Sequence, residues 1–316
     1  MVQGSSLSTP ILLLTFNRLE TTKRVLEAIR EVKPTLLYLA SDGPRLEKEY
    51  EAEKVAQVRA YLDNAIDWDC EVKKLYRDSN LGCKESVFSS IKWFFEQEEF
   101  GIVLEDDCLP SVSFFQFCQE LLIKYIDDER IGMISGRNNL GAYKDECLSY
   151  VFSTGGSIWG WATWQRVVNQ FDVNDKTLLD SNLYEYLLSA TSDRDESRYL
   201  TEQVAATFTG QSNTWDFQWG VFQKINSMLA IVPTRNLIEN IGFGEGATHT
   251  VKADNSHNID VFNVDFPLKH PSVILADRTF SKKLASTYLP RGLKHHLKRL
   301  PFVLAVYTKL KAAVGK

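Results

Sequence analysis

The sequence predicts an α/β protein with a mostly parallel central sheet and helices on both faces. Two observations carry this prediction. Short apolar runs in the first half alternate with longer segments whose apolar residues recur at helical spacing. Such alternation is typical of βαβ units, which build parallel sheets covered by helices. The 316 residues, 44% hydrophobic and 24% charged, are enough for one large domain or a domain with a smaller lobe.

The elements of the first half follow in order along the chain. Continuous apolar runs at 11–15, 36–40 and 101–104 indicate strands buried on both faces, and 71–76 completes the set. The segments between them are expected to be helices at 18–30, 46–62 and 86–96.

The second half is less regular, and we place the division near residue 136. It has a Gly/Trp run at 154–164, expected helices at 182–189, at 196–208 and up to 228, and a short strand at 229–232. The predicted organisation is 1–136, 137–277 and a basic C-terminal helical tail at 278–316. The tail carries ten Lys/Arg and no Asp or Glu, so the remainder of the chain has a charge of −15 within the total of −5.

The tail allows two interpretations. Its Lys, Arg and His residues interleave with apolar residues from 291 to 311. This pattern suits a helix on an anionic membrane surface, and it equally suits a terminal helix packed on the acidic body.

Several classes of protein are disfavoured. The five cysteines form no CxxC pair, which argues against a zinc site or disulfide framework and suits a reducing cytosol. We find no signal peptide and no apolar run long enough to span a membrane, so a cytoplasmic location is expected, either free or peripheral on the inner membrane face. GxGxxG, GxxxxGK[ST] and GxSxG motifs are missing. No nucleic-acid partner is expected, and the oligomeric state stays open.

Polar residues follow each predicted strand, where ligands of such sheets bind. The sets are Asn17-Arg18, Asp42-Gly43, Arg77-Asp78 and Glu105-Asp106-Asp107. Three adjacent carboxylates repel one another unless a cation compensates them, and Mg²⁺ or Mn²⁺ sites use one or two carboxylates plus substrate phosphates. The alternative for these acids is a solvated turn.

The other candidates also have two interpretations. Arg18 opens a helix, where the helix dipole disfavours a cation unless an anion such as diphosphate lies nearby. Asp42 is either a turn former or an acceptor for a base or ribose. Asp216, between two aromatic residues, is either a general base or a helix cap. His249 lies in a Gly-rich loop and is either a ligand contact or a surface residue.

Taken together, PILLLTFNR, LASDGP, RDSNLGC, VLEDDCLPS, GSIWGWATW and TWDFQW resemble GT-A (Rossmann-like) glycosyltransferases, in particular bacterial relatives of N-acetylglucosaminyltransferase I, over roughly residues 9–250. The resemblance implies that Asp107 binds Mn²⁺ (or Mg²⁺), that Glu105 and Asp106 lie by ribose and sugar, and that Asp216 is the catalytic base. It implies that Arg18 contacts nucleotide or diphosphate and Asp42 the uracil. The remaining nucleotide-sugar-binding candidates are Thr15, Asn17, Arg77, Asn80, Gly82, Trp161, Trp215 and His249, the last in a loop at 240–250 that resembles one closing over the donor.

The resemblance therefore implies a metal-dependent, inverting transfer of a sugar from a UDP-sugar to a hydroxyl of a saccharide acceptor, free or lipid-linked, in surface polysaccharide synthesis. Residues 1–136 would bind the nucleotide-sugar and 137–277 the acceptor. The chain departs from the family after Trp215-Asp216, where Phe-Gln-Trp follows, and this concerns acceptor contacts. The alternatives are a sugar-nucleotide nucleotidyltransferase and a non-catalytic nucleotide-sugar-binding module.

Overall fold

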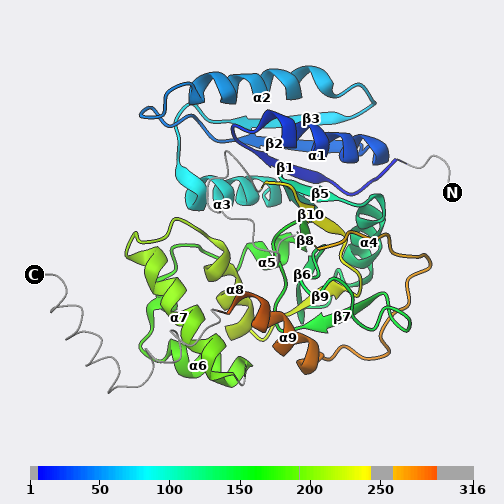
Figure 1. The fold of residues 1–316 in the computed structure, drawn as a ribbon, viewed down its shortest axis with the longest axis vertical. Coiled ribbons are helices and arrows are strands. Elements are labelled where there is room, and N and C mark those ends of the chain that lie inside the picture. The colour runs from blue at the N-terminus through cyan, green and yellow to red at the C-terminus, as the bar shows by residue number, and fades with distance from the viewer. Residues whose placement is uncertain (1–5, 192, 243–258, 290–316) are drawn as a thin grey trace, which may run out of the picture.

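The computed structural model describes residues 6–191, 193–242 and 259–289, and its core is a twisted sheet (Figure 1). Within these residues the sheet has eight strands in the order β3-β2-β1-β4-β8-β6-β9-β7. The strands are β1 (Ile11–Thr15), β2 (Leu36–Ser41), β3 (Glu71–Tyr76), β4 (Phe100–Glu105), β6 (Ile131–Ser135), β7 (Tyr150–Ser153), β8 (Trp161–Trp164) and β9 (Leu229–Pro233). Strands β1 to β4 pair in parallel, β6 pairs in parallel with β9, and β8 and β7 are antiparallel to their neighbours.

Helices cover both faces of this sheet, as the sequence predicted. The helices are α1 (Leu19–Val32), α2 (Glu51–Ala65), α3 (Gly82–Phe95), α4 (Val112–Lys124), α5 (Gln165–Val168), α6 (Leu183–Thr191), α7 (Arg194–Phe208), α8 (Asp216–Ile225) and α9 (Arg278–Tyr288), with a 3₁₀ turn at Lys176–Leu179. Helices α1 and α2 connect strands in one direction along the sheet and α3 returns in the other. Because βαβ crossovers are right-handed, α3 lies on the opposite face from α1 and α2. The contacts agree, since α1 packs on α2 and α4 whereas α3 packs on β1, β4 and α5.

The predicted strands at 11–15 and 71–76 are confirmed with the same bounds, and the mostly parallel α/β class is confirmed with them. Differences occur at the helix starts. The helix expected from 46 begins at Glu51, because the chain turns after Pro44 and Tyr50 takes a left-handed conformation. Helix α3 begins four residues before the expected position 86, at Gly82.

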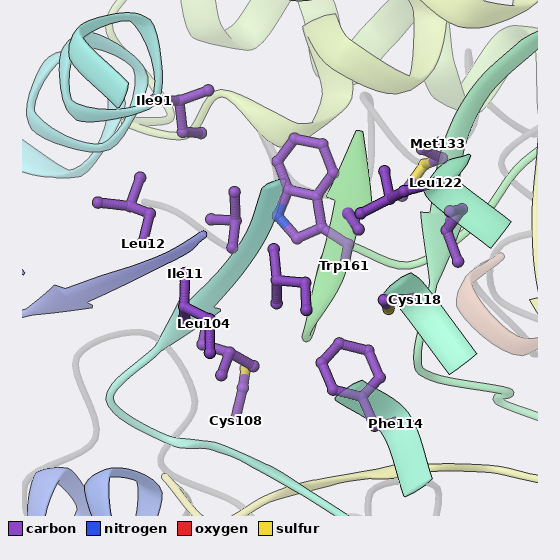
Figure 2. Packing of buried hydrophobic residues seen from close by; sticks show 14 of the residues in the cluster. Ile11, Leu12, Ile91, Leu104, Cys108, Phe114, Cys118, Leu122, Met133 and Trp161 are labelled. Carbon is purple, nitrogen blue, oxygen red and sulfur yellow. The ribbon is translucent and has the colours of Figure 1, made fainter. Parts of the chain in front are cut away.

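The main core lies where β1, β4 and β8 meet α3 and α4. Figure 2 shows the Trp161 ring of β8 at its centre, with Leu104 of β4 on one side and Phe114 and Cys118 of α4 on another. All four side chains are at most 1% exposed, so this packing holds the first half of the sheet to the second half.

A smaller lobe packs beside the second half of the sheet. Helices α6, α7 and α8 share a separate apolar cluster that includes Leu187, Val204 and Val221. Helix α9 packs on β7, so residues 278–289 of the predicted tail belong to the folded body (Figure 1). Residues 290–316 lie outside the described range. Among the described helices, none combines the length and apolar character needed to cross a bilayer.

A two-stranded antiparallel sheet positions the end of the first half. Strand β5 (Cys108–Pro110) pairs with β10 (Ile238–Asn240), which returns from far along the chain. This pairing brings residues 241 and 242 beside the acidic residues that follow β4. The sequence analysis did not predict it, because two three-residue strands carry no periodic signal.

Candidate functional site

A cavity of about 370 Å³ lies at the carboxyl ends of β1, β2 and β4 and the start of α3. We call it the strand-end cavity. Among the residues predicted from the sequence, those that line it are Thr15, Arg18, Asp42, Asn80, Gly82, Glu105, Asp106 and Asp107. The structure therefore brings together four strand-end segments, because parallel strands all end at the same edge of the sheet.

Arg18 lies between the acidic residues of this cavity. Its Nη1 donates to Asp107 Oδ2 at 2.8 Å, and its Nη2 pairs with Asp106 Oδ1. The backbone N–H of Phe16 also donates to Asp106, to Oδ2 at 3.2 Å. One guanidinium therefore offsets the repulsion between two neighbouring carboxylates, and it does so from the first turn after β1.

Burial shifts the pKa values of these carboxylates despite the ion pairs with Arg18. Burial raises the pKa of Asp106 to about 6, although the charge of Arg18 works against that rise. Burial and the charges of Asp107 and Asp106 raise the pKa of Glu105 to about 8. Burial opposes the charged form of Arg18, but the two carboxylates outweigh it, so the pKa of Arg18 lies above its ordinary value. The cavity thus concentrates negative charge that a second cation would stabilise.

Asp42 organises the turn after β3. Its carboxylate accepts hydrogen bonds from the Asn80 side chain at 3.0 Å and from the backbone N–H groups of Leu81 and Gly82 at 3.0 and 3.2 Å. Asp42 is 8% exposed and lines the cavity. The turn-forming interpretation describes what this side chain does here, and a contact with a nucleobase stays a proposal.

Gly43 makes the close approach of the β2 and β3 loops possible, which gives a stability prediction. A Cβ added at Gly43 would lie 2.6 Å from the backbone N and O of Ser79. Gly43→Ala is therefore expected to lower the free energy of unfolding by about 1–3 kcal/mol, the usual range for overpacking. Gly220→Ala is the matched control, since its Cβ meets nothing within 4 Å and lies inside helix α8. Urea denaturation should show Gly220→Ala unchanged or about 0.5–1 kcal/mol more stable than the wild type. Equal denaturation midpoints for the two variants would contradict the claim that the close approach to Ser79 requires a glycine at position 43.

At Gly242, just after β10, the backbone passes very close to the Arg18–Asp107 ion pair. A Cβ at this position would lie 2.7 Å from Arg18 Nη1 and closer still to Asp107 Oδ2. Ile241 N also donates to the backbone oxygen of Asp107 at 2.8 Å. Gly242 is the last described residue of the segment at 240–250 that was predicted to close over a donor. Its continuation at 243–258, which contains the candidate His249, lies outside the described residues.

Four predicted site residues lie elsewhere. Asn17 donates to Glu51 at 3.0 Å, and Arg77 donates to the hydroxyls of two α3 serines at 2.8 and 3.0 Å. Neither side chain lines the strand-end cavity. Trp161 and Trp215 are 1% and 2% exposed and pack against each other with ring centroids 5.8 Å apart. Both rings belong to the main apolar core, and neither lines the strand-end cavity.

Sequence reasoning missed other lining residues. Phe16 and Arg45 line the strand-end cavity, with the Arg45 guanidinium 5.5 Å from the Phe16 ring centroid. Trp159 lines it too, two residues before the core residue Trp161. Phe16 could have been predicted as a lining residue from the sequence, because it lies between the candidates Thr15 and Asn17. Within the Gly/Trp run, only the fold decides which ring faces a cavity.

A second cavity, of about 1,210 Å³, adjoins the first and is lined by residues of α7, α8 and α9. We call it the lobe cavity. Asp216, the first residue of α8, lines it and accepts a hydrogen bond from the Thr214 hydroxyl. Trp159 lines both cavities. The Asp216 carboxylate is also close enough to Glu105 for its charge to help raise the pKa of Glu105.

Cys83 lines the strand-end cavity, where carboxylates of both cavities affect it. Burial, followed by the charges of Glu105, Asp216 and Asp42, raises the pKa of its thiol to about 12. The thiol is therefore neutral near pH 7 and is a poor nucleophile.

The donor chemistry of the strand-end cavity fits a sparsely ligated divalent cation. The described residues contain no group of three or more His, Cys, Asp or Glu side chains arranged around a common point. A magnesium or manganese site completed by substrate phosphates needs only one or two carboxylates. Asp107 has a side chain that is 13% exposed, against 3% for Asp106, so it is the better placed of the two.

The chain matches no protein-family model and no curated protein. Among solved structures it is similar to S. aureus TarS 1–349, with 9% identity, a TM-score of 0.40, and coverage of 73% of this chain and 59% of that chain. UDP-glucose pyrophosphorylase complexed with UDP-glucose gives 9% identity, a TM-score of 0.36, and coverage of 74% and 93%. HddC from Yersinia pseudotuberculosis complexed with GMP-PN gives 10% identity, a TM-score of 0.33, and coverage of 52% and 80%. These similarities are too low to assign a function.

Proposed function

We propose that the protein is a metal-dependent, inverting glycosyltransferase of the GT-A type that moves a sugar from a UDP-sugar to a hydroxyl of a saccharide acceptor. The observation that carries the proposal is the junction of two cavities at Trp159, with strand-end carboxylates in one and Asp216 in the other. A transferase needs a donor site and an acceptor site that meet at the reacting atoms, and two cavities that share Trp159 support that assignment.

On the donor side, the proposal assigns the diphosphate to the end of β1. Arg18 is the guanidinium nearest the acidic residues and would contact phosphate oxygens. Asp107 would hold Mn²⁺ or Mg²⁺, which supplies Lewis-acid stabilisation of the leaving diphosphate. Phe16 and Arg45, at the same cavity, offer a flat ring and a donor for the nucleobase. Asp42 and Asn80 would hold that end of the cavity in shape through their hydrogen bond.

On the acceptor side, the proposal assigns Asp216 as general base. The acceptor hydroxyl would give its proton to the Asp216 carboxylate as its oxygen bonds to the anomeric carbon. The bond from that carbon to the diphosphate breaks, and the diphosphate leaves with the electron pair. Attack from the face opposite the diphosphate inverts the anomeric configuration. The hydroxyl of Thr214 would hold the carboxylate through its hydrogen bond to Asp216 Oδ1.

The test is product release from defined donors. We expect the protein with Mn²⁺ to release UDP from one UDP-sugar of a panel, with EDTA abolishing the release. A sugar-nucleotide nucleotidyltransferase would instead release pyrophosphate from a nucleoside triphosphate and a sugar 1-phosphate. A binding module would show a Mn²⁺-dependent thermal shift with the nucleotide-sugar and release neither product. Pyrophosphate release, or binding without turnover, would replace the proposal by the corresponding alternative.

Two further parts of the expectation rest on residues outside the described range. Membrane attachment through 290–316, with a lipid-linked acceptor in surface polysaccharide synthesis, stays a proposal supported by the basic composition of the tail. Deletion of 290–316 is expected to lower binding to vesicles that contain phosphatidylglycerol. Unchanged binding would favour the other interpretation, a tail that packs on the body.

A further inference from the structure

The lobe cavity contains a buried ion pair that the proposed chemistry does not use. Lys224 Nζ lies 3.1 Å from Glu196 Oε1, and the two side chains are 5% and 6% exposed. Lys224 also donates to the backbone oxygen of Thr154 at 2.8 Å, and the Tyr288 hydroxyl donates to Glu196 Oε1 at 2.6 Å. These bonds join α7, α8 and α9 at one wall of the cavity. A buried pair of this kind is weak support for stability, and both of its members line a cavity that has room for a ligand.

The pair keeps hydrogen-bonding capacity for a ligand. Both contacts to Glu196 go to Oε1, and within the described residues no hydrogen bond engages its Oε2. Lys224 has three N–H groups, of which two are accounted for by Glu196 and Thr154. One acceptor of Glu196 and one donor of Lys224 therefore remain without a hydrogen-bond partner within the described residues. A sugar hydroxyl, or two adjacent hydroxyls, can donate to one and accept from the other.

Two buried donors on the same helix also have no partner. Trp219 Nε1 and Gln223 Nε2 make no hydrogen bond within the described residues, although each side chain is only 2% exposed. Both residues line the lobe cavity. Both nitrogens are closed to solvent, so a ligand in the cavity does not contact them directly, and their missing partners remain a cost in free energy.

The charge balance and the rings of the cavity indicate a neutral ligand. Its charged lining residues are of both signs, Arg137 and Lys224 against Glu196, Asp216 and Asp260. An anionic ligand would meet more carboxylates than cations. Aromatic residues line the same space, among them Trp159, Tyr199 and Phe217, and the apolar face of a sugar ring packs on such rings.

Helix α8 sets the length of the ligand. Asp216, Trp219, Gly220, Gln223 and Lys224 all line the cavity, at the spacing of one helix face. Asp216 and Lys224 are eight residues apart, which is about 12 Å along a helix at 1.5 Å per residue. That separation exceeds the reach of one sugar ring from its own reacting hydroxyl.

We infer that the lobe cavity binds an extended, neutral saccharide of two or more units, whose distal unit is recognised by Glu196 and Lys224. The inference rests on the proposed function for one feature, the placement of the reacting hydroxyl at Asp216. Glu196 and Lys224 are specificity-determining residues in this scheme and take no part in bond formation. Acceptors that share the reacting sugar are then distinguished by the unit that follows it.

The experiment is glycan-array binding with the full-length protein, followed by titration of the retained glycans. We expect neutral oligosaccharides to bind and the corresponding monosaccharides to bind at least about tenfold more weakly. Gly220→Leu places a side chain in the open space above α8 and should abolish glycan binding.

Matched variants separate recognition from folding. Gln218→Met changes a buried residue of α8 that does not line the cavity, and its glycan affinity should equal that of the wild type. The double variant E196Q/K224M removes the pair without leaving one charge alone, and should lose glycan affinity at least tenfold. A purely structural pair would change the melting temperature of this variant and leave its glycan affinity unchanged.

The outcomes distinguish this inference from the proposed function. UDP binding with Mn²⁺, measured by thermal shift, reports the strand-end cavity alone. Retained UDP binding with no glycan bound, or with glycan binding unaffected by Gly220→Leu and E196Q/K224M, would overturn the inference and leave the proposed function standing. Glycan binding that depends on these residues, in a protein that binds no UDP, would overturn the proposed function and leave the inference standing.

Discussion

Replacing Asp107 with alanine is expected to abolish metal-dependent turnover while the protein stays folded. The Asp107 side chain is the proposed metal ligand, and Lewis-acid stabilisation of the leaving group amounts to several kcal/mol. Turnover should therefore fall by at least about a thousandfold. The fold should survive because Arg18 keeps its ion pair with Asp106, and because one of three mutually repelling carboxylates is removed. The measurements are UDP release across a Mn²⁺ titration and the melting temperature.

Asp145→Ala is the matched control for this variant. Asp145 also pairs with an arginine, Arg235 at 2.7 Å, but it lines neither cavity. Its loss should leave turnover and the Mn²⁺ dependence as in the wild type. Full turnover in Asp107→Ala, with an unchanged requirement for Mn²⁺, would mean that the metal binds elsewhere.

Asp216→Asn should lower the turnover number by about 10²–10⁴, the usual contribution of a general base. The amide oxygen can still accept the hydrogen bond from Thr214, so the geometry at the start of α8 is preserved while the proton acceptor is lost. Donor binding should be unchanged, because Asp216 lines the lobe cavity and not the strand-end cavity. Steady-state kinetics with saturating donor, together with UDP titration by thermal shift, separates these two effects.

Thr214→Val complements that measurement. It removes the hydroxyl that donates to Asp216 Oδ1 and keeps the carboxylate. The turnover number should fall less than in Asp216→Asn, because the base is present but is held less firmly. A wild-type turnover number in Asp216→Asn would refute the base assignment and direct attention to other acceptor-side carboxylates such as Asp260.

The first half of the fold was largely predictable because its signals are local. Strands β1 and β4 are fully apolar over four or more residues, and α1 buries Val25, Leu26 and Ile29 at helical spacing. Strand β8 carries a weaker signal: its four residues, WATW, lie in a Gly/Trp run. The sequence analysis could not place it between β4 and β6, since its pairing with β4 joins residues more than 50 positions apart and its pairing with β6 joins residues more than 20 positions apart.

The candidate site divides in the same way. The acidic residues after β4 and Arg18 after β1 were predicted together because parallel strands end at one edge, and the structure places them in one cavity. Arg77 and Asn17 have the same strand-end signal but point to α3 and to Glu51. Side-chain direction after a strand depends on the local turn, which strand position does not determine.

By itself, the sequence determined the βαβ order, the strand-end carboxylates and Asp216 at the start of a helix. Only the tertiary structure decided that Trp159 and not Trp161 faces the cavities, that Asp42 holds the turn at residues 80–82, and that α9 belongs to the lobe cavity. The physical reason is the separation along the chain over which each kind of interaction acts. Periodicity and turn chemistry act over a few residues, whereas a cavity wall and a buried ion pair such as Glu196–Lys224 form between elements that meet only when the chain has folded.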